Sequence, residues 1–116
     1  MTTVTSARTL AHPARDEIRL DGVLHALADP MRMTVVRELA AASGELSCSC
    51  FDLPVTKSTT THHFRVLRES GVIRQVYRGT AKMNELRREE LDELFPGLLD
   101  VVLAAADREA DRLGDI

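Results

Sequence analysis

Aromatic residues are scarce in this sequence: its 116 residues include three Phe, one Tyr and no Trp. Aliphatic side chains and alanine must therefore supply the core, which favours helices that pack closely. No apolar run approaches the about 20 residues of a membrane-spanning helix, and the N-terminus lacks the apolar core of a signal peptide. We therefore expect one small cytoplasmic domain with no membrane partner.

Cysteine is also rare, and the two that occur, Cys48 and Cys50, are separated by one residue. A disulfide between them would close too small a loop to stabilise a fold, so they do not indicate a secreted protein. They remain candidates either for metal ligands or for small, partly buried side chains.

The charge is unevenly distributed, although the formal net charge is only −3. Residues 57–88 carry eight basic and two acidic side chains, whereas residues 89–116 carry two basic and nine acidic ones. A basic segment of this kind is a local footprint for a polyanion, and the acidic C-terminal part would stay away from phosphates.

One helix is predicted over residues 57–70, with Thr56 as N-cap and Gly71 as the residue that ends it. At 100° per residue, Thr60, His63, Phe64 and Leu67 share a side that can pack. The opposite side carries hydroxyls, an imidazole and cations: Lys57, Ser58, Thr61, His62, Arg65 and Arg68. Such groups read base edges and phosphates, although a solvated polar face without function has the same pattern.

The N-terminal part begins with residues 1–15, which show no sustained apolar period and are expected to form a flexible tail, with His12 as a solvated residue. Apolar residues at helical spacing predict a first helix over residues 16–28. Asp29 and Pro30 then supply the N-cap and first residue of a second helix, which ends near Ala42.

The second helix has a predicted buried stripe, with Arg32 and Arg37 outside it. The stripe consists of Met31, Val35, Val36, Leu39 and Ala40. A short helix or turn over roughly residues 47–53 leads to the 57–70 helix, which is therefore the second helix of a helix-turn-helix pair.

After Gly71 the pattern changes to two strand-like runs, residues 72–77 and 81–86, joined by Arg78-Gly79-Thr80. Arg74, Arg78 and Lys82 make this hairpin basic. A basic hairpin after a helix-turn-helix pair is typical of a wing that lies over a nucleic-acid backbone or minor groove. A hairpin that only closes one edge of the core has the same pattern.

The C-terminal part is predicted to be helical over residues 87–95 and 98–113, interrupted by Pro96-Gly97. Its apolar stripe is long for so small a domain, so we expect it to pack, with the first helix, against a second copy of the chain. The expected interface residues are Leu20, Leu24, Leu94, Leu98, Leu99, Val102 and Leu103. The alternative is a monomer in which the helix folds back along its own core.

These elements and three motifs resemble the ArsR/SmtB family of bacterial winged helix-turn-helix transcriptional regulators over about residues 18–106. The motifs are Leu-Ala-Asp-Pro-Met-Arg ending at Arg32, Glu-Leu-Ser-Cys-Ser-Cys ending at Cys50, and the run from Thr61 to Ile73. The resemblance implies a mainly α fold with a small β-hairpin, helices at both ends forming a dimer interface, and one DNA-binding and dimerisation domain over residues 16–113. It also implies a homodimer that binds double-stranded operator DNA and usually represses an operon.

Carried over residue by residue, the DNA-reading positions of the family fall on Lys57, Ser58, Thr61 and His62. We expect Ser58, Thr61 and His62 to approach base edges in the major groove. Phosphate contacts are expected from Lys57, Arg65 and Arg68, and Arg78 with Thr80 is expected to anchor the wing.

The sequence says least about whether an effector, such as a metal ion, controls DNA binding. Many members of the family release DNA when they bind a metal or when a thiol is oxidised, and Cys48-Ser49-Cys50 resembles the Cys-x-Cys of sensors for arsenic, cadmium and lead. Thiolates would suit a thiophilic or transition metal as effector. Residues two apart on a regular helix point about 200° apart, so one ion would need an irregular turn or ligands from a partner. The favoured alternative is that both cysteines are small, partly buried side chains without a sensor role.

Two other classes of function fit the sequence less well. An enzyme is not expected, because the sequence offers no nucleophile, base or closed metal set beyond these cysteines and the adjacent His62 and His63. The terminal helix has carboxylates but no His, which argues against a zinc or nickel cluster there. The alternative to a DNA-binding regulator is a winged-helix interaction module that acts through a second protein and has no effector ligand.

Overall fold

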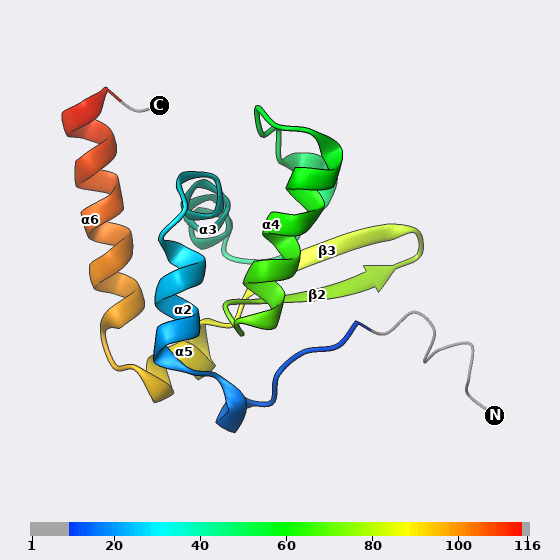
Figure 1. The fold of residues 1–116 in the computed structure, drawn as a ribbon, viewed down its shortest axis with the longest axis horizontal. Coiled ribbons are helices and arrows are strands. Elements are labelled where there is room, and N and C mark those ends of the chain that lie inside the picture. Colours follow the sequence, from blue (N-terminus) through cyan, green and yellow to red (C-terminus); the bar gives the residue numbers. More distant parts are fainter. Residues whose placement is uncertain (1–9, 115–116) are drawn as a thin grey trace. The chain divides into compact units, whose positions relative to one another are not determined.

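The structure, a computed structural model, describes residues 10–114 (Figure 1). Contacts divide the chain into two compact units with a boundary between Leu86 and Arg87. The first unit contains a three-stranded sheet and the helix-turn-helix pair, and the second contains two helices. In chain order the elements are η1 (Arg15–Glu17), α2 (Leu20–Leu27), α3 (Pro30–Ala42), β1 (Leu46–Ser47), η2 (Cys48–Cys50), α4 (Lys57–Glu69), β2 (Ile73–Arg78), β3 (Ala81–Leu86), α5 (Arg88–Leu94) and α6 (Leu98–Leu113).

The first helix is shorter than the sequence predicts. A 3₁₀ turn, η1, occupies residues 15–17, the backbone of Ile18 and Arg19 is extended, and α2 begins only at Leu20. The extended stretch lets the side chain of Ile18 turn into the core, where it is 7% exposed and lies against Gly71. Tertiary packing of one isoleucine therefore overrides the helical period at this point.

The second helix begins and ends as predicted. The carboxylate of Asp29 accepts hydrogen bonds from the backbone N–H groups of Met31 and Arg32, and Pro30 is the first helical residue. The residue in the left-handed conformation after Ala42 is Ser43, at φ 59°. Val35, Val36 and Leu39 are buried, whereas Met31 and Ala40 of the predicted stripe are only half-buried.

One prediction for this helix is wrong: Arg32 does not lie outside the buried side. It is 7% exposed, and its Nε donates to the carbonyl oxygen of Ala26 at 2.8 Å. A buried guanidinium is tolerated when its N–H groups find acceptors, and here the carbonyls at the C-terminal end of α2 provide them.

Residues 47–53 contain a 3₁₀ turn, η2, and no α-helix. The preceding β1 was not predicted; it pairs antiparallel with β3, with Leu46 opposite Asn84. The strand order is β1-β3-β2, so β2 is an edge strand. A two-residue strand is too short to show an alternating pattern in the sequence. Its pairing partner, β3, also lies far away in the sequence, so no local signal indicates the pairing.

Helix α4 and the hairpin agree with prediction. Helix α4 spans Lys57–Glu69, with Thr56 accepting from the N–H of Thr59 at 3.1 Å. Gly71 adopts φ +88°, and the N–H groups of Gly71 and Val72 donate to the carbonyls of Arg68 and Leu67, which is the Schellman pattern. Strands β2 and β3 pair from Ile73–Leu86 to Arg78–Ala81 around a two-residue turn. Figure 1 shows α4 against this hairpin, whose tip extends beyond the helix.

The core of the first unit joins these elements. Helix α4 contacts α2, α3 and β2, and α3 contacts α2 and β3. Its buried apolar side chains come from α2, α3, α4, β2 and the residue just before β2, and they include Val23, Ala26, Val35, Val36, Leu67, Val72 and Ile73. In the second unit α5 contacts α6, and Gly97 at φ +79° turns the chain between them.

The first described residues also belong to the fold, which corrects part of the predicted tail. Residues 1–9 of that tail lie outside the described residues. His12, expected to be solvated, accepts a hydrogen bond from the backbone N–H of Gln75 through Nε2 at 2.9 Å. His12 therefore contacts the edge of the sheet. Within the described residues, no helix combines the length and the apolar character that a membrane crossing requires.

Candidate nucleic-acid interface

Helix α4 presents the predicted polar face to solvent. Lys57, Ser58, Thr61, His62 and Arg65 are all exposed. On the other side His63, Phe64 and Leu67 are buried, with exposures of 8%, 3% and 0%. The two sides predicted from a helical wheel are therefore the two sides of α4 in the folded chain.

The hydroxyls on this face are oriented by the helix itself. Thr61 donates its Oγ1 hydrogen to the carbonyl of Lys57 at 3.0 Å, and Ser58 Oγ lies 3.3 Å from Oγ1 of Thr56. Because the proton of Thr61 is used within the helix, the lone pairs of its oxygen remain as acceptors, which suits the exocyclic amino groups of adenine or cytosine.

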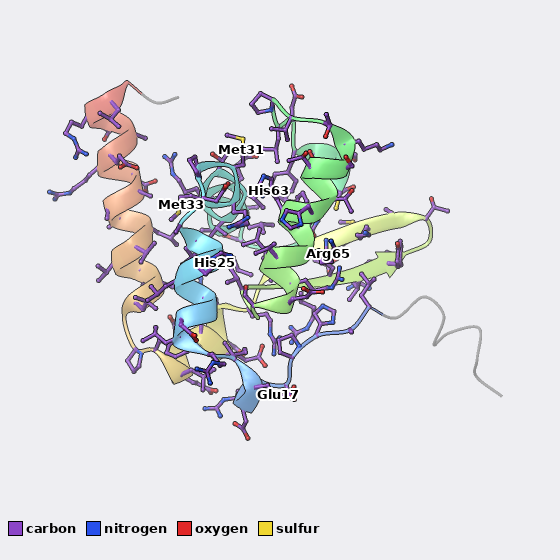
Figure 2. All side chains as sticks on the ribbon, viewed as in Figure 1. Glu17, His25, Met31, Met33, His63 and Arg65 are labelled. Atoms are coloured by element: carbon purple, nitrogen blue, oxygen red, sulfur yellow. The ribbon has the colours of Figure 1, made fainter. Side chains whose placement is uncertain are left out.

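A buried arginine anchors the helix. Figure 2 shows His63 on α4 on the side of α3, and Nη1 of Arg32 lies 3.1 Å from its Nδ1. Since a guanidinium can only donate, Nδ1 of His63 accepts and the ring is neutral, with its proton on Nε2. The orientation of α4, and with it the exposed face that includes Arg65, is fixed in part by this contact.

A cleft of about 850 Å³ lies between η2, the N-terminal half of α4 and the hairpin. Three residues of the predicted DNA-binding set, Lys57, Thr61 and Thr80, line it. It also contains Lys82 and Tyr77, a cross-strand pair in which Nζ of Lys82 lies 5.7 Å from the ring centroid. Lys82 and Tyr77 were missing from the predicted set; the basic character of the hairpin was the signal for Lys82.

Two arginines of the predicted DNA-binding set, the expected phosphate ligand Arg68 and the expected wing anchor Arg78, already bind acceptors of the protein itself. Nη1 of Arg68 donates to Oε1 of Gln75 at 2.6 Å, and its Nε donates to the carbonyl of Ala11 at 3.2 Å. Arg78 forms a bidentate pair with Glu45, Nε to Oε1 at 2.7 Å and Nη2 to Oε2 at 2.5 Å. Hydrogen bonding to Arg78 holds the pKa of Glu45 below its ordinary value. A phosphate would have to compete with these acceptors.

The two cysteines lie on η2, and both are free thiols. Sγ of Cys48 accepts from Nδ2 of Asn84 at 3.2 Å, and Asn84 is fully buried. Cys50 is exposed. The irregular turn that a shared ion would need is thus present, but the described part of the chain contains no group of three or more His, Cys, Asp or Glu side chains that could hold a metal.

The predicted interface leucines differ in exposure. Leu20 and Leu24, one turn apart on α2, are 47% and 44% exposed, which is high for large apolar side chains. On the second unit Leu94, Leu98, Val102 and Leu103 are half-buried, and Leu99 is buried. Val101, 67% exposed, was not predicted.

No family model matches the chain. An uncharacterised HTH-type transcriptional regulator of Bacillus subtilis (strain 168), YceK, is 30% identical to it over 89 residues, which are 75% of this chain and 88% of the relative. The crystal structure of an ArsR family transcriptional regulator matches with a TM-score of 0.58 at 23% identity, covering 79% of this chain and 96% of that one. The chain belongs to the ArsR family of winged helix-turn-helix transcriptional regulators.

Two further solved structures share the ArsR fold. One is a possible transcriptional regulator for arsenical resistance, with 26% identity, 82% and 94% coverage of the two chains and a TM-score of 0.54. The other is the transcriptional repressor BigR from Xylella fastidiosa, with 22% identity, 66% and 85% coverage and a TM-score of 0.52. These relatives are regulators and not enzymes, in agreement with the sequence analysis.

Proposed function

We propose that this ArsR family regulator is a homodimeric repressor that binds operator DNA through the exposed face of α4 and the β2–β3 wing. The observation that carries the proposal is the exposure, on one side of a helix anchored from behind by Arg32, of hydroxyls, an imidazole and two cations. Short polar groups at the N-terminal end of such a helix suit base edges, and cations suit the flanking phosphates.

Each exposed residue has a role in this proposal. Ser58, Thr61 and His62 contact base edges in the major groove, and Lys57 and Arg65 bind phosphates. Thr80 in the hairpin turn and Lys82 on β3, both lining the cleft, hold a strand of the DNA backbone against the wing. Arg78 and Arg68 join them only when their internal acceptors are displaced.

The direct test is a salt-controlled titration of the protein with DNA from its own promoter region. The double substitution His62→Ala and Arg65→Ala should weaken binding at least about tenfold, because it removes one base contact and one phosphate contact. His25→Ala is the matched control: His25 is an exposed histidine on α2, away from α4 in sequence, and its variant should bind as the wild type does. Unchanged affinity of the double variant would overturn the docking arrangement.

The homodimer is supported by the exposed Leu20 and Leu24 and by the exposed Val101, since apolar side chains of this size gain by burial against a second copy. In a dimer, each protomer reads one half-site, with centres about one helical turn of DNA apart. Sedimentation of the purified chain should show a dimer, and Leu20→Glu with Leu24→Glu should shift it toward the monomer. A wild-type monomer at micromolar concentration would refute this part of the proposal.

Repression is tested by placing the promoter upstream of a reporter, whose expression should rise when the regulator is absent. A metal response through Cys48 and Cys50 stays a prediction, because η2 offers one ion two thiols and a further ligand must come from elsewhere. Loss of DNA binding on addition of a thiophilic metal, abolished by Cys48→Ser with Cys50→Ser, would establish it. If specific DNA binding is absent altogether, the interaction-module alternative takes its place.

A further inference from the structure

Residues 10–14 dock on the open edge of the sheet through one imidazole. Nε2 of His12 lies 2.9 Å from the backbone nitrogen of Gln75, and Nδ1 lies 2.9 Å from the carbonyl oxygen of Leu10. Gln75 is on β2, whose other side pairs with β3, and within residues 10–114 no further strand lies beside β2 to pair with its N–H. The imidazole therefore takes the place of a neighbouring strand at this one position.

These two contacts require the neutral ring. The N–H of Gln75 can only donate, so Nε2 must be an unprotonated acceptor, and the carbonyl of Leu10 can only accept, so Nδ1 must carry the proton. Protonation of His12 would place an N–H of the ring against the N–H of Gln75. Docking of the segment is thus coupled to a proton that histidine exchanges between about pH 5 and 8.

The docked segment also holds an arginine of the recognition helix. Nε of Arg68 donates to the carbonyl of Ala11, the residue before His12, and Nη1 donates to Oε1 of Gln75, the residue that His12 caps. The side chain of Gln75 is 1% exposed and is fixed in turn by Asn84 at 2.7 Å. The same two residues, His12 and Gln75, therefore decide where the guanidinium of Arg68 is held.

We propose that His12 is a positioning residue for the DNA interface: its neutral form docks residues 10–14 and keeps Arg68 inside the fold, and its protonation releases Arg68 to a DNA phosphate. This inference rests on the proposed function, because it assigns regulation to the same interface. It also explains how Arg68 can lie on the polar face of α4 and yet be only half exposed.

Charged groups on the neighbouring elements include some that favour protonation of the His12 ring and some that oppose it. Cations oppose its formation and carboxylates favour it. The cations are Arg68 on α4, Arg74 on β2 and Arg15 on η1, and the carboxylates are Asp16 and Glu17 on η1 and Glu85 opposite Arg74 on β3.

The first experiment needs no DNA. Hydrogen exchange of the Gln75 amide should be about three- to tenfold less protected at pH 5.5 than at pH 7.5 after correction for intrinsic rates, as expected for loss of one hydrogen bond. His12→Gln keeps an acceptor that does not titrate and should stay protected at both pH values, whereas His12→Ala should be unprotected at both. Protection in the wild type that does not depend on pH would overturn the proposal.

The second experiment measures the salt dependence of DNA binding at both pH values. Release of Arg68 in each protomer adds about two phosphate contacts per dimer, so lowering the pH should steepen the slope of log K against log salt by about 2 in the wild type relative to His12→Gln. His62 is the same in both proteins, so its contribution cancels in this comparison. In an Arg68→Ala background the difference should vanish.

A difference that persists without Arg68 would show that the charge of His12 itself acts, and would overturn the assigned route. His25→Gln is the control, because His25 is a histidine of the same unit and none of the hydrogen bonds cited for residues 10–14 involves it. This variant should behave as the wild type. If the chain binds no DNA, the proposed function fails while the exchange of the Gln75 amide still tests the docking of His12.

Discussion

Arg32 and His63 meet 3.1 Å apart between two helices, and both side chains are buried. The same guanidinium reaches the carbonyls of Ala26 at 2.8 Å and His25 at 3.3 Å, at the C-terminal end of α2. One side chain thus joins α2, α3 and α4, and the helix that faces the proposed DNA is positioned by a residue on its far side.

Arg32→Ala should therefore destabilise the fold strongly. It leaves buried carbonyls and Nδ1 of His63 without a donor, which should cost about 2–4 kcal/mol in the free energy of unfolding. Urea denaturation followed by circular dichroism gives the value. Arg19→Ala is the control, because the Arg19 side chain is 78% exposed and its loss should cost less than about 0.5 kcal/mol. Equal stabilities of the two variants would contradict the anchoring role.

The N-cap of α3, Asp29, makes the free energy of unfolding depend on pH. Burial raises the pKa of this carboxyl, but hydrogen bonds from the N–H groups of Arg32 and Met31 outweigh it, and the net pKa is below the ordinary value of 3.8. Its ionised form thus stabilises the fold above about pH 4, and this contribution disappears as the pH falls through the folded-state pKa.

Asp29→Ala should cost about 1 kcal/mol at neutral pH, and the difference from wild type should shrink toward pH 2. Asp29→Asn, which keeps an acceptor but no charge, should show a cap contribution that is independent of pH. Thermal unfolding between pH 2 and 7 measures both variants. A stability gap between wild type and Asp29→Ala that widens on acidification would contradict the sign of the shift.

Gly71 ends helix α4, and Gly22, inside α2, provides a control for replacing it. A Cβ on Gly71 would lie 2.5 Å from Cγ1 of Ile18, at φ +88°, whereas nothing lies within 4 Å of a Cβ on Gly22. Gly71→Ala should cost about 2–4 kcal/mol from strain and overpacking. Gly22→Ala, inside α2, should stabilise by about 0.5–1 kcal/mol. Similar changes in the two denaturation midpoints would refute the special role of Gly71.

Glu45 should weaken DNA binding through the wing. Its carboxylate neutralises Arg78 and would lie near the phosphate that Arg78 is proposed to meet. Glu45→Gln should increase DNA affinity severalfold and steepen its salt dependence, with little change in melting temperature because the pair is exposed. In an Arg78→Ala background the same substitution should have no such effect on affinity. A loss of affinity in Glu45→Gln would show that the ion pair instead holds the wing in its binding geometry.

Local signals in the sequence were sufficient for the helix-turn-helix pair and the hairpin. Asp29-Pro30, Thr56 and Gly71 act on neighbouring backbone groups, so their effects can be read from adjacent residues. The polar face of α4 followed from helical spacing in the same way.

Contacts between distant residues were not predictable from these patterns. The polar side chain of Arg32 favours a position outside the core, and the partner with which it is buried, His63, is 31 residues away. The residues around His12 have the composition of a tail, and the N–H group to which His12 bonds is 63 residues away. The pairing of β1 with β3 was not predictable for the same reason, and neither were the hydrogen bonds of Arg68 and Arg78 within the protein. Each of these contacts depends on a partner that is distant in the sequence.

The central claim, that α4 binds DNA phosphates and bases through its exposed face, is tested most directly by the salt dependence of binding to the promoter region. If Lys57 and Arg65 of both protomers contact phosphates, log K should fall with log salt with a slope of about −4 or steeper. Lys57→Ala with Arg65→Ala should reduce the magnitude of that slope by about 3 to 4. An equally steep slope in the variant, or a wild-type slope near zero, would contradict the account.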